Sequence, residues 1–182
     1  MRRPLTVAVT GSIGAGKSEV LRAFGRRGVP VQSSDEVVHR LIASDPEVRA
    51  ALEERFGTTE RARIAEVVFA DSNELAWLEA LLHPRVRREH EVWVSGLDGA
   101  PVCVAEVPLL FESGSEARFD RVVVVTAPEE TRAARSKVDL ARRSSRLMPD
   151  DEKVHRADYV FVNDGSLEEV DRFVERVLEE LR

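Results

Sequence analysis

The chain has 182 residues, of which 43% are hydrophobic and 33% are charged, and its formal net charge is −6. This length fits one domain with a sizeable core, and it leaves room for an inserted sub-domain. The negative charge argues against a general binder of nucleic acid or membrane surfaces, because those partners are themselves polyanions.

The amino-terminal and cysteine patterns point to a cytoplasmic protein. Met1 precedes only a short apolar run, too brief for a signal peptide or a membrane span. The single Cys103 lies in the apolar run Val102–Val104, so we expect a buried thiol and no internal disulfide. A monomer is the default expectation.

Short apolar runs alternate along the chain with longer amphipathic stretches. The runs that predict strands are Leu5–Thr10, Val29–Gln32, Pro101–Val107, Arg121–Thr126 and Asp158–Val162. Two segments, Val102–Val107 and Val122–Val125, are apolar almost throughout, which is typical of parallel strands covered by helices on both faces. The alternation predicts an α/β fold, doubly wound about a parallel sheet.

The stretch between the second and third runs contains no convincing strand. It predicts the helices Asp35–Ala43, Asp45–Phe56, Ala62–Ala70 and Ser72–Val94. Because such a stretch is too long for a loop, we expect a helical insertion over about 36–96 within a single domain. Other helical patterns cover Lys17–Arg27, Glu129–Lys137 and Ser166–Leu181, the last with a capping-box spacing of Ser166 and Glu169.

A complete phosphate-loop motif follows the first run. It consists of Gly11, Ser12, Ile13, Gly14, Ala15, Gly16, Lys17 and Ser18, in the pattern G-x-x-x-x-G-K-[ST]. Glycines let backbone N–H groups wrap a phosphate, and the following helix presents its positive end to the same anion. We expect Lys17 to reach the β- and γ-phosphates of ATP and the Ser18 hydroxyl to bind Mg²⁺.

The rest of the chain favours a small kinase over other phosphate-loop proteins. No N-K-x-D segment for reading guanine occurs, and the chain is too short for a motor ATPase. The segment Arg132–Arg146 holds six basic residues and the single acid Asp139. It predicts a lid over about 132–147, in which Arg135 and Arg142 stabilise the transferring phosphoryl group. A solvated helix face is the alternative for these residues.

Further segments make the chain resemble the dephospho-coenzyme A kinase family over nearly its whole length. The most specific is Pro108-Leu109-Leu110-Phe111-Glu112 after the third run. The others are Thr10–Ser18, Ser34-Asp35 with His39, Arg61 with Val67-Val68-Phe69, Leu81-Leu82-His83-Pro84, Glu152-Lys153, Ala157-Asp158-Tyr159-Val160, and Asn163 with Gly165. The family has a P-loop kinase fold with a five-stranded parallel core, a helical coenzyme A-binding region and a lid. It transfers the γ-phosphate of ATP to the ribose 3′-hydroxyl of dephospho-coenzyme A, with Mg²⁺.

The resemblance also implies residue roles. Asp35 would be the general base, with a helix N-cap as the alternative. Glu106 would hold Mg²⁺ through water, and Asn163 and Gly165 would contact adenine. The acceptor would be bound by Asp35, Arg61, His83, Pro108, Leu109 and Leu110, although for Leu109, Leu110 and Phe111 a core role is the open alternative.

Departures from the family pattern concern rate and acceptor specificity, and one of them is an abbreviated insertion around Phe56–Arg61. Ser33 stands where the family has a first acid, and Arg146 stands where it commonly has glutamine in a longer lid. Two rival functions stay open: another P-loop kinase with a different acceptor, and a nucleotide-binding regulatory module without transfer chemistry.

Overall fold

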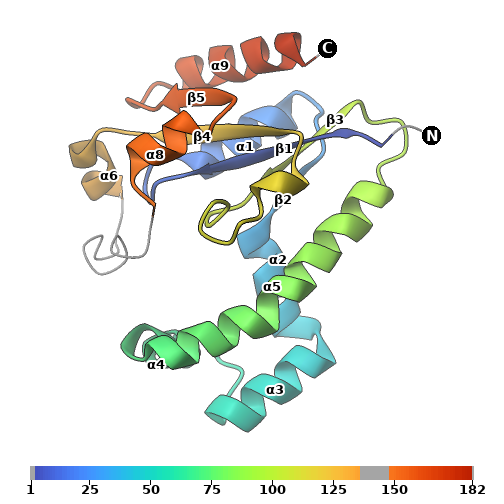
Figure 1. Cartoon of the computed structure of the whole chain (residues 1–182), viewed down its shortest axis with the longest axis vertical. Coiled ribbons are helices and arrows are strands. Elements are labelled where there is room, and N and C mark those ends of the chain that lie inside the picture. Colours follow the sequence, from blue (N-terminus) through green and yellow to red (C-terminus); the bar gives the residue numbers. More distant parts are fainter. Residues whose placement is uncertain (1–2, 136–147, 182) are drawn as a thin grey trace. The chain divides into compact units, whose positions relative to one another are not determined.

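A parallel five-stranded sheet organises the larger part of the molecule (Figure 1). The computed structural model describes residues 3–135 and 148–181. Within them the strands are β1 (Leu5–Gly11), β2 (Val31–Ser33), β3 (Val102–Glu106), β4 (Arg121–Thr126) and β5 (Tyr159–Val162). Their spatial order is β2-β3-β1-β4-β5 and every neighbouring pair is parallel, which confirms the predicted fold class.

Alternating side chains of the central strands supply two separate cores. Val7 and Val9 of β1 belong to a cluster with residues of α1 (Lys17–Arg26) and α9 (Leu167–Glu180). Ala8, between them, belongs to a second cluster with Leu110 and Phe111. This division is the period-two pattern of a strand covered on both faces.

The first core explains why α1 and α9 form where they do. Val20, Leu21 and Phe24 recur on one side of α1 and are all buried. In α9 the buried residues are Val170, Phe173, Val174 and Val177, spaced by three and four. The Ser166 hydroxyl accepts the N–H of Glu169 at 3.3 Å, which confirms the predicted cap.

A separate compact unit, residues 34–96, consists of helices. They are α2 (Ser34–Ser44), α3 (Pro46–Phe56), α4 (Arg61–Ala70) and α5 (Ser72–Ser95). This unit has its own core, made of Val37, Leu41, Ile42, Val48, Leu52, Ile64, Val68 and Leu82. Asp45 and Asp71 cap α3 and α5 by accepting backbone N–H groups at 2.9 and 2.8 Å. The remaining described residues form the other unit.

Some boundaries differ from the sequence prediction. The second strand is Val31–Ser33 rather than Val29–Gln32, because Val29 packs into the core before the strand begins. Two elements among residues 3–135 and 148–181 escaped prediction, the short η1 (Glu116–Arg118) and α8 (Asp150–His155). The signal for α8 was present: Pro149 is followed directly by acidic residues, a pattern of helix starts.

Cys103 lies in the sheet with no exposed surface, as predicted, and burial raises the pKa of its thiol to about 11.

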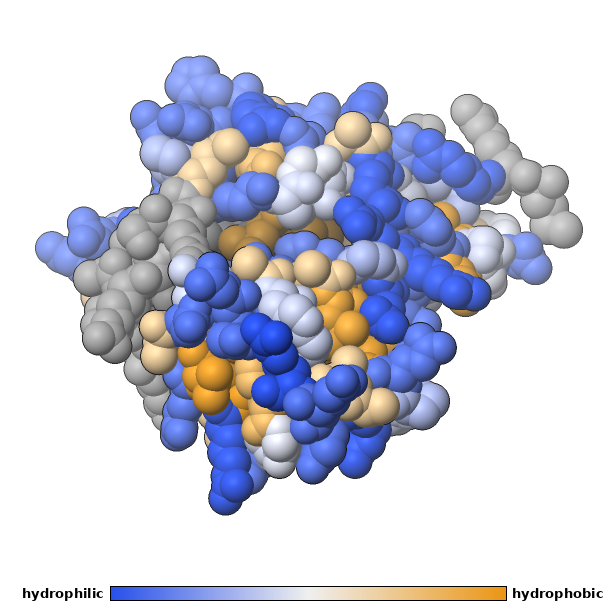
Figure 2. Space-filling model, turned by 60° about the horizontal axis from the view of Figure 1, so that its bottom comes forward, coloured by the Kyte–Doolittle hydropathy of each residue, from blue (hydrophilic) through white to orange (hydrophobic). Residues whose placement is uncertain are grey.

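Hydrophilic residues dominate the face seen in Figure 2, with hydrophobic residues in separate groups. In the described parts of the chain, no helix combines the length and apolar character that a membrane crossing requires.

Candidate active site

The phosphate loop joins the carboxyl end of β1 to α1, as the motif predicts. Gly11 has φ +135°, and a Cβ there would lie 1.9 Å from the carbonyl oxygen of Val125. Gly16 has φ +95°, and a Cβ there would lie 2.2 Å from Nδ2 of Asn163. The backbone therefore takes a course that only glycine allows at these two positions. Within the described residues no side chain caps α1 at Gly16, which suits a helix terminus that receives an anion.

Side chains from two other elements fix the shape of this loop. Nδ2 of Asn163, directly after β5, donates to the carbonyl of Ala15 at 2.8 Å, and Asn163 is only 5% exposed. The hydroxyl of Ser12 donates to the carboxylate of Asp150 at the start of α8. Sequence reasoning missed this contact of Ser12, because its two residues lie far apart in the chain.

The side chain of Lys17 lies against the backbone of the loop to which it belongs. Its Nζ donates to the carbonyl oxygens of Gly11 and Ser12 at 3.1 and 3.0 Å. The ammonium group is therefore held at the loop, within reach of an anion bound there.

Ser18 and Glu106 bring two kinds of oxygen together beside the loop. The Ser18 hydroxyl lies 3.4 and 3.3 Å from the two carboxylate oxygens of Glu106, at the end of β3. Glu106 is 5% exposed. Hydroxyl and carboxylate oxygens are hard ligands that suit Mg²⁺, which commonly keeps several waters as well. This donor set fits the predicted metal site, in which Glu106 acts through water. In the described part of the chain no three His, Cys, Asp or Glu side chains form a metal cluster.

One of the two predicted catalytic arginines lies beside the loop. Arg135 ends α6 (Glu129–Arg135), and its guanidinium nitrogens lie 3.8 and 3.4 Å from the positions that Cβ atoms would take on Gly16 and Gly165. The Arg135 guanidinium therefore lies beside Gly16 of the phosphate loop and beside Gly165. Arg142 and most of the predicted lid, residues 136–147, lie outside the described residues.

Arg132, one turn before Arg135, also lies beside the loop, since a Cβ on Gly14 would lie 2.8 Å from its carbonyl oxygen. Its Nε donates to the carbonyl of Ala127 at 3.1 Å, and its Nη1 lies 3.8 Å from Asp150. These contacts connect the Arg132 side chain to the residues before α6 and to α8.

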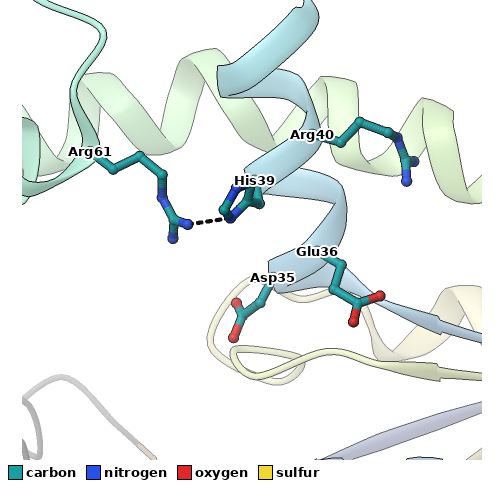
Figure 3. A pocket seen from close by; sticks show the side chains of 5 residues that line it. All are labelled: Asp35, Glu36, His39, Arg40 and Arg61. Carbon is teal, nitrogen blue, oxygen red and sulfur yellow. Dashed lines mark hydrogen bonds between the residues drawn. The ribbon is translucent and has the colours of Figure 1, made fainter.

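In the helical unit, a pocket of about 530 Å³ contains two predicted acceptor residues. Figure 3 shows its lining residues, Asp35, Glu36, His39, Arg40 and Arg61. The Nη1 of Arg61, at the start of α4, contacts Nδ1 of His39, and Arg40 points away from this pair. Asp35 and His39 are four residues apart, so they share one face of α2. That spacing could have identified His39 as a pocket residue from the sequence.

The structure revises the alternative role of Asp35 as the N-cap of a helix. The helix α2 begins at Ser34, so Asp35 lies in its first turn and is not the N-cap. An acid in the first turn still interacts favourably with the helix dipole, but the exposed carboxylate is available to a ligand.

The remaining predicted acceptor residues have different surroundings. Pro108 and Leu109 are half-buried, and His83 is half-buried in α5, which also contains Pro84. Leu110 has no exposed surface and packs with Ala8, Val122 and Val124. This burial favours the core alternative for Leu110 over a contact with substrate.

The comparisons agree with this geometry. A family model described as dephospho-CoA kinase matches residues 5–169. The dephospho-CoA kinase of Mesorhizobium japonicum is 37% identical over 191 residues, which cover 98% of this chain and 97% of that protein. The dephospho-CoA kinase of Rhodopseudomonas palustris is 39% identical over 194 residues, covering 96% and 94%. The crystal structure of TT1252 from Thermus thermophilus superposes with a TM-score of 0.84 at 37% identity, and the match covers 100% of both chains. The chain belongs to the dephospho-CoA kinase family.

Proposed function

We propose that the protein transfers the γ-phosphate of ATP to the ribose 3′-hydroxyl of dephospho-coenzyme A, giving coenzyme A and ADP as the last step of coenzyme A biosynthesis. Family membership supports the choice of acceptor. The observation that carries the proposal is the convergence of Lys17, Ser18 and Glu106 at one phosphate loop. Together they offer an ammonium group, a hydroxyl and a carboxylate, which a kinase requires for a metal-bound triphosphate.

ATP would be held by the loop from Gly11 to Ser18. Backbone N–H groups and the amino end of α1 would bind its phosphates, while Asn163 and Gly165 would lie toward the adenine. Ser18, with Glu106 through water, would hold Mg²⁺, which neutralises charge on the triphosphate oxygens when bound. Arg135 and Arg142 would add guanidinium groups against the charge that spreads over the transferring group.

The acceptor would be bound by the residues that the family resemblance implies. Asp35 would orient the 3′-hydroxyl and take its proton as the new O–P bond forms and the bond to the β-phosphate breaks. The cationic Arg61 suits the phosphate groups of dephospho-coenzyme A. His83, Pro108 and Leu109 would complete the acceptor site.

All of these residues come from one chain, so we propose that the enzyme works as a monomer, as a single kinase domain. The net charge of −6 is against partnership with nucleic acid or a membrane surface. We place the reaction in the cytoplasm.

The experiment that tests this function measures ADP formation with dephospho-coenzyme A, AMP, CMP or shikimate as the acceptor. We expect turnover with dephospho-coenzyme A and background rates with the other three. Turnover with a nucleoside monophosphate but none with dephospho-coenzyme A would identify another P-loop kinase. ATP binding without transfer to any acceptor would identify a regulatory nucleotide-binding module.

A further inference from the structure

The buried Lys153 pairs with the last residue of the segment from Pro108 to Glu112, the most specific part of the family resemblance. Lys153, in α8, is 1% exposed, and its Nζ lies 3.0 Å from Oε1 of Glu112. The same Oε1 accepts the backbone N–H of Met148 at 2.9 Å. The other oxygen of Glu112, Oε2, is buried and lacks a hydrogen-bond partner among the described residues.

This pair joins two segments that are far apart in sequence. Glu112 ends Pro108-Leu109-Leu110-Phe111-Glu112, and Lys153 belongs to α8. A second pair, Arg156 with Glu116, connects the same segments nearer the surface, and the Arg156 guanidinium lies 4.5 Å from the ring centre of Phe111. Several side-chain contacts therefore connect the segments 108–116 and 148–156.

Each of the two segments contacts the phosphate loop or the strand directly before it. Pro108 comes two residues after Glu106, and its carbonyl accepts the hydroxyl of Thr10 at 3.4 Å. On the other side, Asp150 of α8 accepts the hydroxyl of Ser12. A change in the position of residues 108–116 relative to α8 would therefore also change the positions of the phosphate loop and of Pro108.

Stability alone does not account for this pair. Burying an ammonium and a carboxylate carries a desolvation cost that their attraction offsets only in part, and apolar residues of similar size are often as stabilising. Oε2, which has no hydrogen-bond partner in the part of the chain that the structure describes, adds to that cost. A buried charge pair does, however, permit fewer relative positions of the two segments than apolar packing does.

We propose that Glu112 and Lys153 are positioning residues, which set the place of the segment 108–116 so that Pro108 and Leu109 can receive the acceptor. The assignment of the acceptor rests on the proposed function. Neither residue is a catalytic residue, since their effect passes through the segment they hold.

The test compares Lys153→Met with the double variant Glu112→Leu/Lys153→Met. The single variant leaves a buried carboxylate without its cation, and its Tm should fall by roughly 10 °C. In the double variant Tm should return to within about 4 °C of the parent. Its kcat/KM for dephospho-coenzyme A should stay about tenfold or more below the parent, mainly through KM, while the Kd for ATP changes less than about threefold.

Hydrogen exchange gives a readout that needs no substrate. The amides of Ser113 and Ser115 donate to Leu109 and Leu110 at 3.0 and 2.9 Å, and they should lose protection in the double variant while the central strands keep theirs. The control is Arg3→Met, which removes an exposed ion pair with Asp120 elsewhere in the same unit and should leave the KM for dephospho-coenzyme A unchanged.

Recovery of Tm, KM and amide protection together in the double variant would overturn the proposal, because the pair would then be only structural. If the double variant does not recover its Tm, the single variant Glu112→Gln tests the proposal instead. It keeps the size of the side chain and an oxygen that accepts the Met148 N–H, but it removes the negative charge. Parental KM and parental protection in Glu112→Gln would overturn the proposal; a raised KM with exposed amides would support it. If the parent itself does not turn over dephospho-coenzyme A, the proposed function fails, and the exchange data still decide whether the pair positions the segment.

Discussion

Asn163 offers a sharp test of how the phosphate loop is held in shape. Replacing it with alanine removes the hydrogen bond from Nδ2 to the carbonyl of Ala15, in a region where Ala15 has no exposed surface. The backbone N–H of Asn163, which donates to Thr126 at 2.7 Å, is kept. The change therefore removes one side-chain contact from the loop and leaves the strand pairing intact.

A buried carbonyl that loses its partner costs about 1–3 kcal/mol. If this cost reduces the free energy of phosphate binding, ATP affinity falls by about 5- to 150-fold, since about 1.4 kcal/mol corresponds to a factor of ten. Isothermal titration of Asn163→Ala with ATP measures the loss. The matched control is Asn73→Ala, because Asn73 is exposed and gives only its backbone N–H to Asp71.

Tripolyphosphate separates support of the loop from a contact with adenine. If Asn163 acts through the loop, its replacement weakens tripolyphosphate and ATP by similar factors. A loss confined to ATP would mean that the amide matters for the base. Parental affinity for both ligands, with an unchanged Tm, would refute the reasoning from the Ala15 contact.

Three further changes have defined outcomes. Lys17→Ala should lower kcat by at least about 10²-fold in a steady-state ADP assay, because it removes charge stabilisation at the transferring group, and an unchanged rate would refute that role. Asp35→Asn should lower kcat with little change in the Kd for ATP; a large loss of ATP binding would indicate a structural role instead. Burial alone would raise the pKa of Asp120, but the hydrogen bonds from Arg3 and Thr6 outweigh it and hold the pKa below the ordinary 3.8. Asp120→Asn should therefore reduce the free energy of unfolding by about 1–2 kcal/mol at neutral pH. This difference should shrink as the pH falls below about 3.8 through the native pKa, and urea titrations that show a difference independent of pH would contradict the assignment.

Local patterns made much of the fold predictable. The five strands follow from β-branched runs, and the phosphate loop follows from a motif whose glycines meet local backbone demands at Gly11 and Gly16. The helices of residues 34–96 follow from caps such as Asp45 and Asp71 and from apolar residues spaced by four, such as Val48 with Leu52. Each of these features is encoded within a short stretch of sequence.

Contacts between distant residues could not be predicted in the same way. Lys153 lies in a short helix among Asp150, Asp151, Glu152 and His155, where an exposed lysine is the usual expectation. Its burial depends on Glu112, which no local pattern connects to it. The open alternative for Leu109, Leu110 and Phe111 has a related cause: three apolar residues in a row do not reveal which of them the turn directs into the core.

The central claim is that the phosphoryl group of ATP arrives on the ribose 3′-oxygen of dephospho-coenzyme A. Phosphorus NMR of the product formed from ATP labelled with ¹⁸O in the γ-phosphoryl group tests it directly. We predict a new labelled phosphomonoester at the 3′-position, formed in equal amount with ADP, and no such product with Lys17→Ala. Label on another hydroxyl, or only in free phosphate, would contradict it.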